Sequence, residues 1–246
     1  MDLSEGIDLS LFLFGTFQKN ISRPRYFVFP EQAIVMDVGA NIGAMTLPYA
    51  IQVPIGHVYA FEPDPLAYEK LVKNISINPQ LCGRITADRV FVSDRTLDTP
   101  VERDVYASWK LTGREAGRHR LHGGIRKTIF MVPQVTLDDY CRKNAIAHVD
   151  LIKIDTDGHE FFVLKGATWI LKTFRPVIIF EAGLYALAEN RVDLNEMVGF
   201  LCDLGYKLLN SRNGKHIKTF NCHKQIPISH TTDIIAIPAN GPIRPY

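Results

Sequence analysis

The chain has 246 residues, enough for one α/β domain with a sizeable buried core. Its formal net charge is +2, with 22% charged and 46% hydrophobic residues, which is the composition of an ordinary globular protein. So small a charge gives no reason to expect nucleic acid or an anionic membrane as a partner. The opening residues, MDLSEGIDLSLFLFGTF, start acidic, and their apolar stretch is too short and interrupted for a signal peptide or a membrane span.

The cysteines at positions 82, 141, 202 and 222 are far apart, and none has the spacing of a structural zinc site. Reduced thiols in a cytoplasmic protein are the simplest interpretation.

The first 33 residues precede the first predicted strand, and we expect them to form an N-terminal cap on a single domain of residues 34–246. In this domain, β-branched runs alternate with stretches of helical periodicity. Strands are expected at residues 34–37, 57–61, 85–92, 150–155, 177–181, 206–210 and 233–237, and helices at 43–51, 65–77, 163–171 and 194–204. The alternation predicts an α/β fold, a mostly parallel twisted sheet with helices on both faces. The last two strands are expected to form an antiparallel edge hairpin.

The run VMDVGANIGAMTL at residues 35–47 combines the end of an apolar strand with a glycine-rich turn and the start of a helix. Asp37 ends the strand, Gly39 allows a tight turn, and Gly43 lets the helix pack closely. Ligands of open α/β sheets bind beyond the carboxyl ends of the strands, where free N–H groups of the helix are available. In the next strand, AFEP places Glu62 at the same edge, where its carboxylate can accept hydrogen bonds from both ribose hydroxyls. The pair of features predicts a nucleoside-containing ligand.

The turn distinguishes between two such ligands. A dinucleotide requires G-x-G-x-x-G, but the middle glycine is missing here and Asn41 lies in the loop. Asp37 would also repel a pyrophosphate. S-adenosylmethionine carries a sulfonium and an ammonium, which Asp37 or Asp155 would favour, so the charges select this ligand.

Four stretches together resemble the FkbM-type methyltransferases: VMDVGANIG, VYAFEPDPLAYEKLVKNISIN, VTLDDYC and LIKIDTDGHEFFVLKGA…PVIIFE. The resemblance extends from residue 34 to about 182. It implies a class I, Rossmann-like fold that uses S-adenosylmethionine and methylates a hydroxyl of a sugar, polyketide or other secondary metabolite. By resemblance, Asp37, Gly39, Asn41 and Gly43 line the methionine part of the cofactor and Glu62 binds its ribose.

The fourth stretch departs from the family pattern KIDVEGAE, because Asp157 replaces a glutamate and His159 replaces a small residue. A central parallel strand should be almost entirely apolar, yet Lys153 and Asp155 lie on one face of it. We therefore predict that Asp155 orients the methyl donor or the acceptor. Asp157 and Glu160 can also be read as helix-capping or first-turn residues.

Methyl transfer to a hydroxyl requires removal of the hydroxyl proton by a base or a metal. His159 is a candidate base because its ordinary pKa lies near neutrality. Asp155, Asp157 and Glu181 could instead hold Mg²⁺, which prefers oxygen ligands. The metal-free base is the favoured interpretation.

Residues 94–128 fall outside the alternating pattern and are predicted to be a lid over the acceptor, with a solvated loop as the alternative. Their basic side chains suggest a carbohydrate acceptor bearing phosphate or carboxylate, and Trp109 could stack on a sugar. The basic residues are Arg103, Lys110, Arg114, Arg118, Arg120 and Arg126.

The sequence therefore predicts an S-adenosylmethionine-dependent O-methyltransferase of a small molecule or glycan. Three alternatives remain: an N-methyltransferase, disfavoured because D-T-D-G replaces an aromatic Asn/Asp-Pro-Pro-Tyr turn; a nicotinamide-dependent oxidoreductase, disfavoured by the missing glycine; and a non-catalytic protein that binds S-adenosylmethionine.

Overall fold

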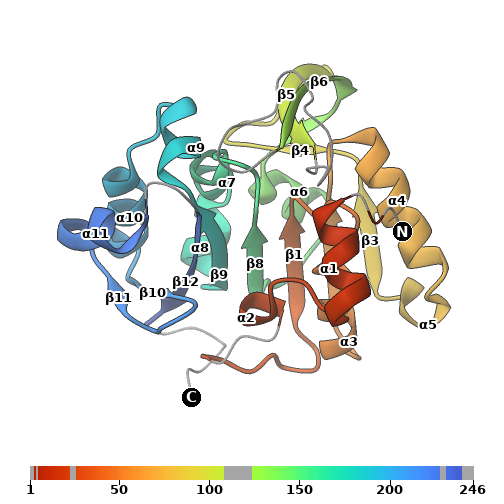
Figure 1. The fold of residues 1–246 in the computed structure, drawn as a ribbon, viewed down its shortest axis with the longest axis horizontal. Coiled ribbons are helices and arrows are strands. Elements are labelled where there is room, and N and C mark those ends of the chain that lie inside the picture. The colour runs from red at the N-terminus through yellow and green to blue at the C-terminus, as the bar shows by residue number, and fades with distance from the viewer. Residues whose placement is uncertain (1–2, 4, 23–25, 108–123, 228–230, 240–246) are drawn as a thin grey trace.

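The structure is a computed structural model that describes residue 3 and residues 5–22, 26–107, 124–227 and 231–239 (Figure 1). Its centre is an eight-stranded sheet in the order β11-β10-β12-β9-β8-β1-β2-β3. The strands are β1 (Ile34–Val38), β2 (His57–Phe61), β3 (Ile85–Asp88), β8 (Leu151–Ile154), β9 (Val177–Ala182), β10 (Tyr206–Asn210), β11 (His216–Ile217) and β12 (Thr232–Pro238). Five neighbouring strands of this sheet, β9, β8, β1, β2 and β3, are parallel to one another. β12 is antiparallel to both of its neighbours, β9 and β10.

This arrangement confirms the predicted α/β fold with antiparallel strands at one edge. The last two predicted strands pair antiparallel as expected, as β10 and β12, with β12 next to β9. A short strand that was not predicted, β11, pairs with the outer side of β10 and forms the edge.

Helices cover both faces of the sheet (Figure 1). They are α1 (Gly6–Phe14), α2 (Lys19–Ser22), α3 (Thr46–Gln52), α4 (Pro65–Ser76), α5 (Pro79–Cys82), α6 (Leu137–Lys143), α7 (Glu160–Lys165), α8 (Thr168–Thr173), α9 (Leu184–Glu189), α10 (Leu194–Asp203) and α11 (Cys222–Gln225), with a 3₁₀ turn at Thr219–Asn221. The start of α4 follows the predicted signals, since Asp64 accepts a hydrogen bond from the Leu66 N–H and Pro65 is the first helical residue. None of these helices in the described residues is long and apolar enough to cross a membrane.

Neighbouring residues of each central strand belong to opposite cores. Met36 and Ile152 pack into the core that includes α6, α7, α8 and α10. Val35 and Leu151 pack into the core that includes α2 and α3. The period of two along a strand thus buries both faces, which is why these strands are apolar at nearly every position.

The chain leaves the sheet after β3, so the single strand predicted over residues 85–92 is wrong in its second half. The Val90 N–H donates to the Asp88 carbonyl (3.1 Å), and this turn separates β3 from β4 (Phe91–Val92). β4 pairs with β7 (Gln134–Val135) in a parallel two-stranded sheet of its own.

Between β4 and β7, the chain forms an antiparallel ribbon of β5 (Val101–Ala107) and β6 (Ile125–Val132). The ribbon stands beyond the carboxyl ends of the central strands (Figure 1). Regular strands thus form both described ends of the stretch that was expected to be irregular. Trp109, Lys110, Arg114, Arg118 and Arg120 lie outside the described residues.

The N-terminal segment lies against the front of the sheet, where α1 and α2 precede β1 (Figure 1). The Asn20 amide, in α2, donates to Ser211 Oγ (2.8 Å) and to a carboxyl oxygen of Asp233 (3.1 Å). Asp233 belongs to β12, so this contact joins the start of the chain to its last strand.

Candidate active site

A cavity of about 540 Å³ lies over the carboxyl ends of the parallel strands and under the ribbon. The turn after β1, the residues after β2 and β8, the end of β9, the ribbon and the N-terminal segment all contribute to its wall. The predicted site residues that line it are Gly39, Asn41, Glu62, Asp155, Asp157, His159 and Glu181. The structure thus brings together residues from four separate segments of the sequence.

Two glycines of the predicted turn have steric roles. Gly39 has a φ of +74°, and a Cβ there would lie 1.9 Å from the backbone oxygen of Asp155. Gly43 has a φ of +91°, and a Cβ would lie 2.8 Å from the Leu71 side chain of α4. Gly39 therefore lets the turns after β1 and β8 touch, whereas Gly43 lies behind the cavity wall and allows helix packing.

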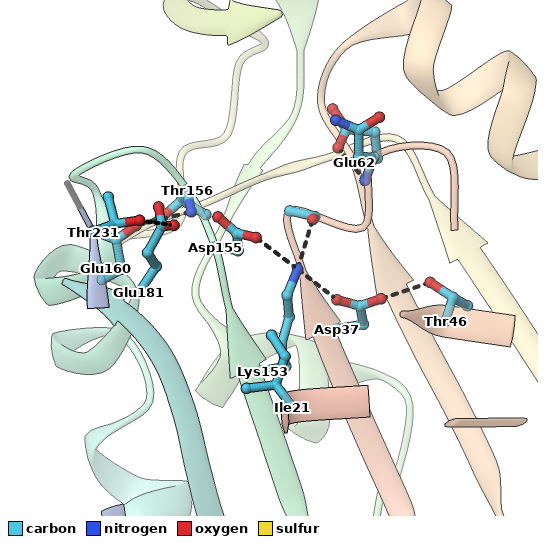
Figure 2. A network of polar contacts seen from close by, with 12 residues as sticks. Ile21, Asp37, Thr46, Glu62, Lys153, Asp155, Thr156, Glu160, Glu181 and Thr231 are labelled. Carbon is cyan, nitrogen blue, oxygen red and sulfur yellow. Dashed lines mark hydrogen bonds and ion pairs between the residues drawn. The ribbon is translucent and has the colours of Figure 1, made fainter. Parts of the chain in front are cut away.

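A buried lysine occupies the centre of the site (Figure 2). Lys153 Nζ lies 3.1 Å from Asp37 Oδ1, 3.6 Å from Asp155 Oδ2 and 3.0 Å from the Gly39 carbonyl oxygen. Burial alone would lower the pKa of Lys153, but the carboxylates of Asp37 and Asp155 outweigh it and raise the pKa. Thr46 Oγ donates to the other oxygen of Asp37 (2.6 Å).

Asp37 is fully buried, so its carboxylate supports the wall of the cavity through Lys153. Asp155 is the member of this ion-pair network that reaches the cavity, with its side chain 29% exposed.

Glu62 is buried at the end of β2, and each of its carboxyl oxygens accepts a backbone N–H. Oε2 accepts from Asn41 (2.8 Å) and Oε1 accepts from Asp64 (2.8 Å). Burial raises the pKa of Glu62 to about 7, although these two hydrogen bonds act in the opposite direction. The carboxylate is therefore fixed in direction but has fewer donors than it would have in water.

The turn after β8 is held by Glu160 and not by Asp157. Glu160 Oε1 accepts from the N–H groups of Thr156 (2.9 Å) and Gly158 (3.2 Å), and from Thr156 Oγ (3.1 Å) (Figure 2). Asp157 makes no capping bond, and α7 begins after His159 without a side-chain cap. Asp157 has a φ of +52°, in the left-handed region that few residues other than glycine adopt.

Two carboxyl groups at this end of the cavity have few donors. Asp157 makes no hydrogen bond or ion pair with the described residues, and burial together with Asp155 and Glu160 raises its pKa to about 8. Glu181 accepts one hydrogen bond, from Thr231 Oγ (2.6 Å), and burial raises its pKa well above the usual range. Burial thus favours the protonated form of both groups relative to an exposed carboxyl group.

His159 lies beside this pair in an aromatic setting. Its ring stacks on Phe162 with centroids 4.6 Å apart and contacts Phe91 at 4.8 Å, and its Nε2 is 3.0 Å from Ser93 Oγ. Burial lowers the pKa of His159 to about 4. The histidine is therefore uncharged at neutral pH and a weaker base than an exposed histidine.

The ribbon forms the roof of the cavity. Tyr106 donates its hydroxyl hydrogen bond to Glu189 Oε2 (2.7 Å), and Arg126 forms an ion pair with Asp104 (2.7 Å). Among the described residues, seven carboxyl side chains and two basic side chains line the cavity. The acidic residues are Glu62, Asp64, Asp104, Asp155, Asp157, Glu181 and Glu189, and the basic ones are Lys153 and Arg126.

The described residues contain no group of three or more His, Cys, Asp or Glu side chains arranged to hold a metal ion. The Mg²⁺ alternative for Asp155, Asp157 and Glu181 stays a prediction.

Sequence reasoning missed several lining residues, among them Gln18 and Tyr185. Tyr106 had little signal, because the three consecutive polar residues at 102–104 interrupt the period-two pattern of a strand. Gln18 had none, since a single glutamine between two short helices has no distinguishing pattern.

A comparison with protein-family models matches residues 37–208 to the methyltransferase FkbM domain. The matched segment begins at Asp37 and includes β2, β8 and β9, the strands that supply Glu62, Asp155 and Glu181.

Curated relatives carry related names. The hexuronic acid methyltransferase AglP of Haloferax volcanii is 27% identical over 149 residues, which cover 61% of this chain and 56% of AglP. The 31-O-demethyl-FK506 methyltransferase FkbM of Streptomyces tacrolimicus is 30% identical over 157 residues, covering 54% and 58%. The 2-O-methyltransferase NoeI of Sinorhizobium fredii is 28% identical over 181 residues, covering 68% and 70%. The chain thus spans less than two thirds of the length of AglP and FkbM.

Among solved structures, the methyltransferase FkbM of Methylobacillus flagellatus KT matches with a TM-score of 0.52 and 18% identity. The match covers 85% of this chain and 44% of that one. This likeness supports the fold.

Proposed function

The chain belongs to the FkbM methyltransferase family, and on this premise we propose that it transfers a methyl group from S-adenosylmethionine to a hydroxyl of a small molecule or glycan. S-adenosylmethionine supplies a methyl group on a sulfonium, whose sulfur leaves without assistance. The protein then has to bind, align and desolvate the two reactants and take up the hydroxyl proton.

The observation that carries the proposal is the carboxylate of Glu62. Backbone N–H groups use one lone pair on each of its oxygens, which leaves room for two more donors. Its pKa of about 7 reflects a carboxylate with too few donors, so two ribose hydroxyls would stabilise the charged form. The residues present therefore fit a nucleoside, with Glu62 on the ribose.

The charges of the wall favour a cationic cofactor. The Asp155 carboxylate reaches the cavity, while Gly39 and Asn41 form the turn beside it. Asp155 would attract the positive charge of the methyl donor, and Asp37 would act by holding Lys153 in place.

For the proton of the acceptor hydroxyl, we assign the base to Asp157 and keep His159 as the alternative. Asp157 lines the cavity with an unpartnered carboxylate among the described residues, and its pKa of about 8 suits proton uptake near neutral pH. His159 is less suitable because its pKa is about 4 and its Nε2 contacts Ser93. A Mg²⁺-assisted reaction remains testable by chelation.

The acceptor class follows from the relatives and the wall. AglP is named for a hexuronic acid, and the names of FkbM and NoeI specify oxygen methylation. Carboxyl side chains predominate over basic ones in the described wall and can accept hydrogen bonds from hydroxyl groups, which supports a hydroxyl-bearing acceptor. We propose that the ribbon of β5 and β6 covers this acceptor.

The test is calorimetric titration with S-adenosylmethionine and S-adenosylhomocysteine. Glu62→Gln keeps the shape of the side chain but removes its charge. The binding free energy should therefore weaken by about 1.5–3 kcal/mol, the scale of a hydrogen bond to a charged group. Glu69→Gln, an exposed change on α4, is the control and should bind normally. Unchanged affinity in Glu62→Gln, or tighter binding of a nicotinamide dinucleotide, contradicts the proposal.

A second experiment addresses the acceptor. Labelled methyl donor should transfer its label to panels of hydroxyl compounds, and a chain that labels only amines would be an N-methyltransferase.

A further inference from the structure

The turn between α1 and α2 carries a residue that lines the cavity and has a buried, unpaired hydrogen-bond acceptor. Gln18 lines the cavity, and its side-chain Oε1 is buried without a hydrogen-bond partner. A buried oxygen without a hydrogen-bond partner is destabilising, so its retention calls for an explanation.

The backbone of Gln18 holds this side chain in an uncommon conformation. Its φ is +44°, and its carbonyl oxygen accepts hydrogen bonds from the N–H groups of Ile21 and Ser22, both at 3.0 Å. The turn that starts α2 therefore fixes the backbone of Gln18 in this conformation. Strained positions of this kind cluster where a ligand is bound.

The surroundings place Gln18 away from the Glu62 end of the cavity. Two residues later, Asn20 bonds to Asp233 of β12, which is paired with Glu181 of β9. Glu62 follows β2, and the sheet order separates β2 from β12 by β1, β8 and β9. If the ribose occupies Glu62, the amino-acid part of the methyl donor is the part that can extend toward Gln18.

Resting on the function proposed above, we infer that Gln18 binds the α-ammonium group of S-adenosylmethionine, with Oε1 accepting one of its N–H bonds. The ammonium is the hydrogen-bond donor of the amino-acid part, whereas the remaining donors lie on the ribose and the adenine. The N-terminal segment is then part of the cofactor site, and the missing partner of Oε1 is supplied by the ligand.

Two probes separate this role from that of Glu62. S-adenosylhomocysteine contains the amino-acid part, whereas 5′-methylthioadenosine keeps the adenosine and the sulfur but lacks that part. Titration of the full chain with both probes compares Gln18→Met, which removes the acceptor at similar size, with Gln18→Glu, which keeps an acceptor oxygen.

We expect Gln18→Met to raise the dissociation constant of S-adenosylhomocysteine by about tenfold or more, as for a lost hydrogen bond to a charged group. The dissociation constant of 5′-methylthioadenosine should change by less than about twofold. Gln18→Glu should bind S-adenosylhomocysteine at least as well as the unchanged chain. Binding of 5′-methylthioadenosine shows that each variant is folded.

Gln225→Met is the matched control. Gln225 Oε1 is also buried without a partner, but this residue lies in α11 and does not line the cavity. Both probes should bind this variant normally.

If Gln18→Met weakens the binding of both probes equally, the variant has a general effect on the fold and the inference is overturned. Unchanged binding of S-adenosylhomocysteine would also overturn it. Strong weakening by Gln18→Glu would indicate that Gln18 faces the carboxylate of the ligand and would also overturn it. If neither probe binds the unchanged chain, or if Glu62→Gln leaves both affinities unchanged, the proposed function itself fails.

Discussion

The two ends of the cavity hold their carboxylates in different ways. At the β2 end, each oxygen of Glu62 accepts a backbone N–H, so the chain itself fixes the position of the group. At the β8 and β9 end, Asp157 has no partner among the described residues and Glu181 has one side-chain partner. Backbone donors preorganise a group for binding, whereas a carboxylate with few hydrogen-bond donors keeps oxygen atoms that can accept a proton from a bound ligand. We propose that the first end serves binding and the second end serves chemistry.

The largest expected effect tests the chemical end. Asp157→Asn removes the proposed base but keeps a residue type that tolerates positive φ, so turnover should fall by roughly 10²–10⁴ while the fold is kept. His159→Gln keeps a polar group for Ser93 and should cost less than about tenfold. Single-turnover rates with saturating cofactor provide the measurement. A larger loss in His159→Gln than in Asp157→Asn would return the base to His159, and silencing by EDTA would favour Mg²⁺.

The next effect concerns the ion-pair network of Lys153, which lies between the two ends. Lys153→Met leaves the fully buried Asp37 without a cation, so the free energy of unfolding should fall by about 3–5 kcal/mol. The double variant Lys153→Met with Asp37→Asn removes both charges and should recover part of the loss. Urea denaturation measures the change, with the exposed Lys172→Met as control. An equal loss in the double variant would show that packing, and not charge, dominates.

The smallest effect is a pH dependence at the binding end. Because burial raises the pKa of Glu62 to about 7 in the free protein, its proton must leave before the carboxylate can accept two ribose hydroxyls. Affinity should therefore fall as the pH drops below 7, by at most about tenfold per unit for one proton, and level off above 7. The ratio of affinities between the unchanged chain and Glu62→Gln isolates this group from other titrations. A ratio that is constant from pH 5 to 8 would place the proton elsewhere.

The binding end was largely predictable because its geometry follows from local sequence. Gly39 marks a turn that no side chain can occupy, and Glu62 directly follows an apolar strand whose partner is fixed by the sheet. Asp64 and Pro65 likewise indicated where α4 begins. In each case a short stretch of chain contains the physical cause.

The chemical end was less predictable because its causes are distant in the sequence. Helix capping was the alternative interpretation of Asp157, but Glu160 supplies the hydrogen bonds of that turn, and the raised pKa of Asp157 depends on burial and on its neighbours. The low pKa of His159 depends first on burial of its ring, which contacts Phe91 and Phe162. Three-dimensional proximity decides these properties, and a linear pattern does not record it.

The parallel pairing of β4 with β7 has a consequence for how this architecture can be altered. Phe91 and Val92 lie beside Gln134 and Val135, so the chain enters and leaves the ribbon at neighbouring points. The entropic cost of bringing these two points together increases only slowly with the length of chain between them. Roof segments of different length can thus be grafted onto the same base without changing the central sheet. On the proposal that the ribbon covers the acceptor, an exchange of this segment between relatives would transfer acceptor preference separately from cofactor binding.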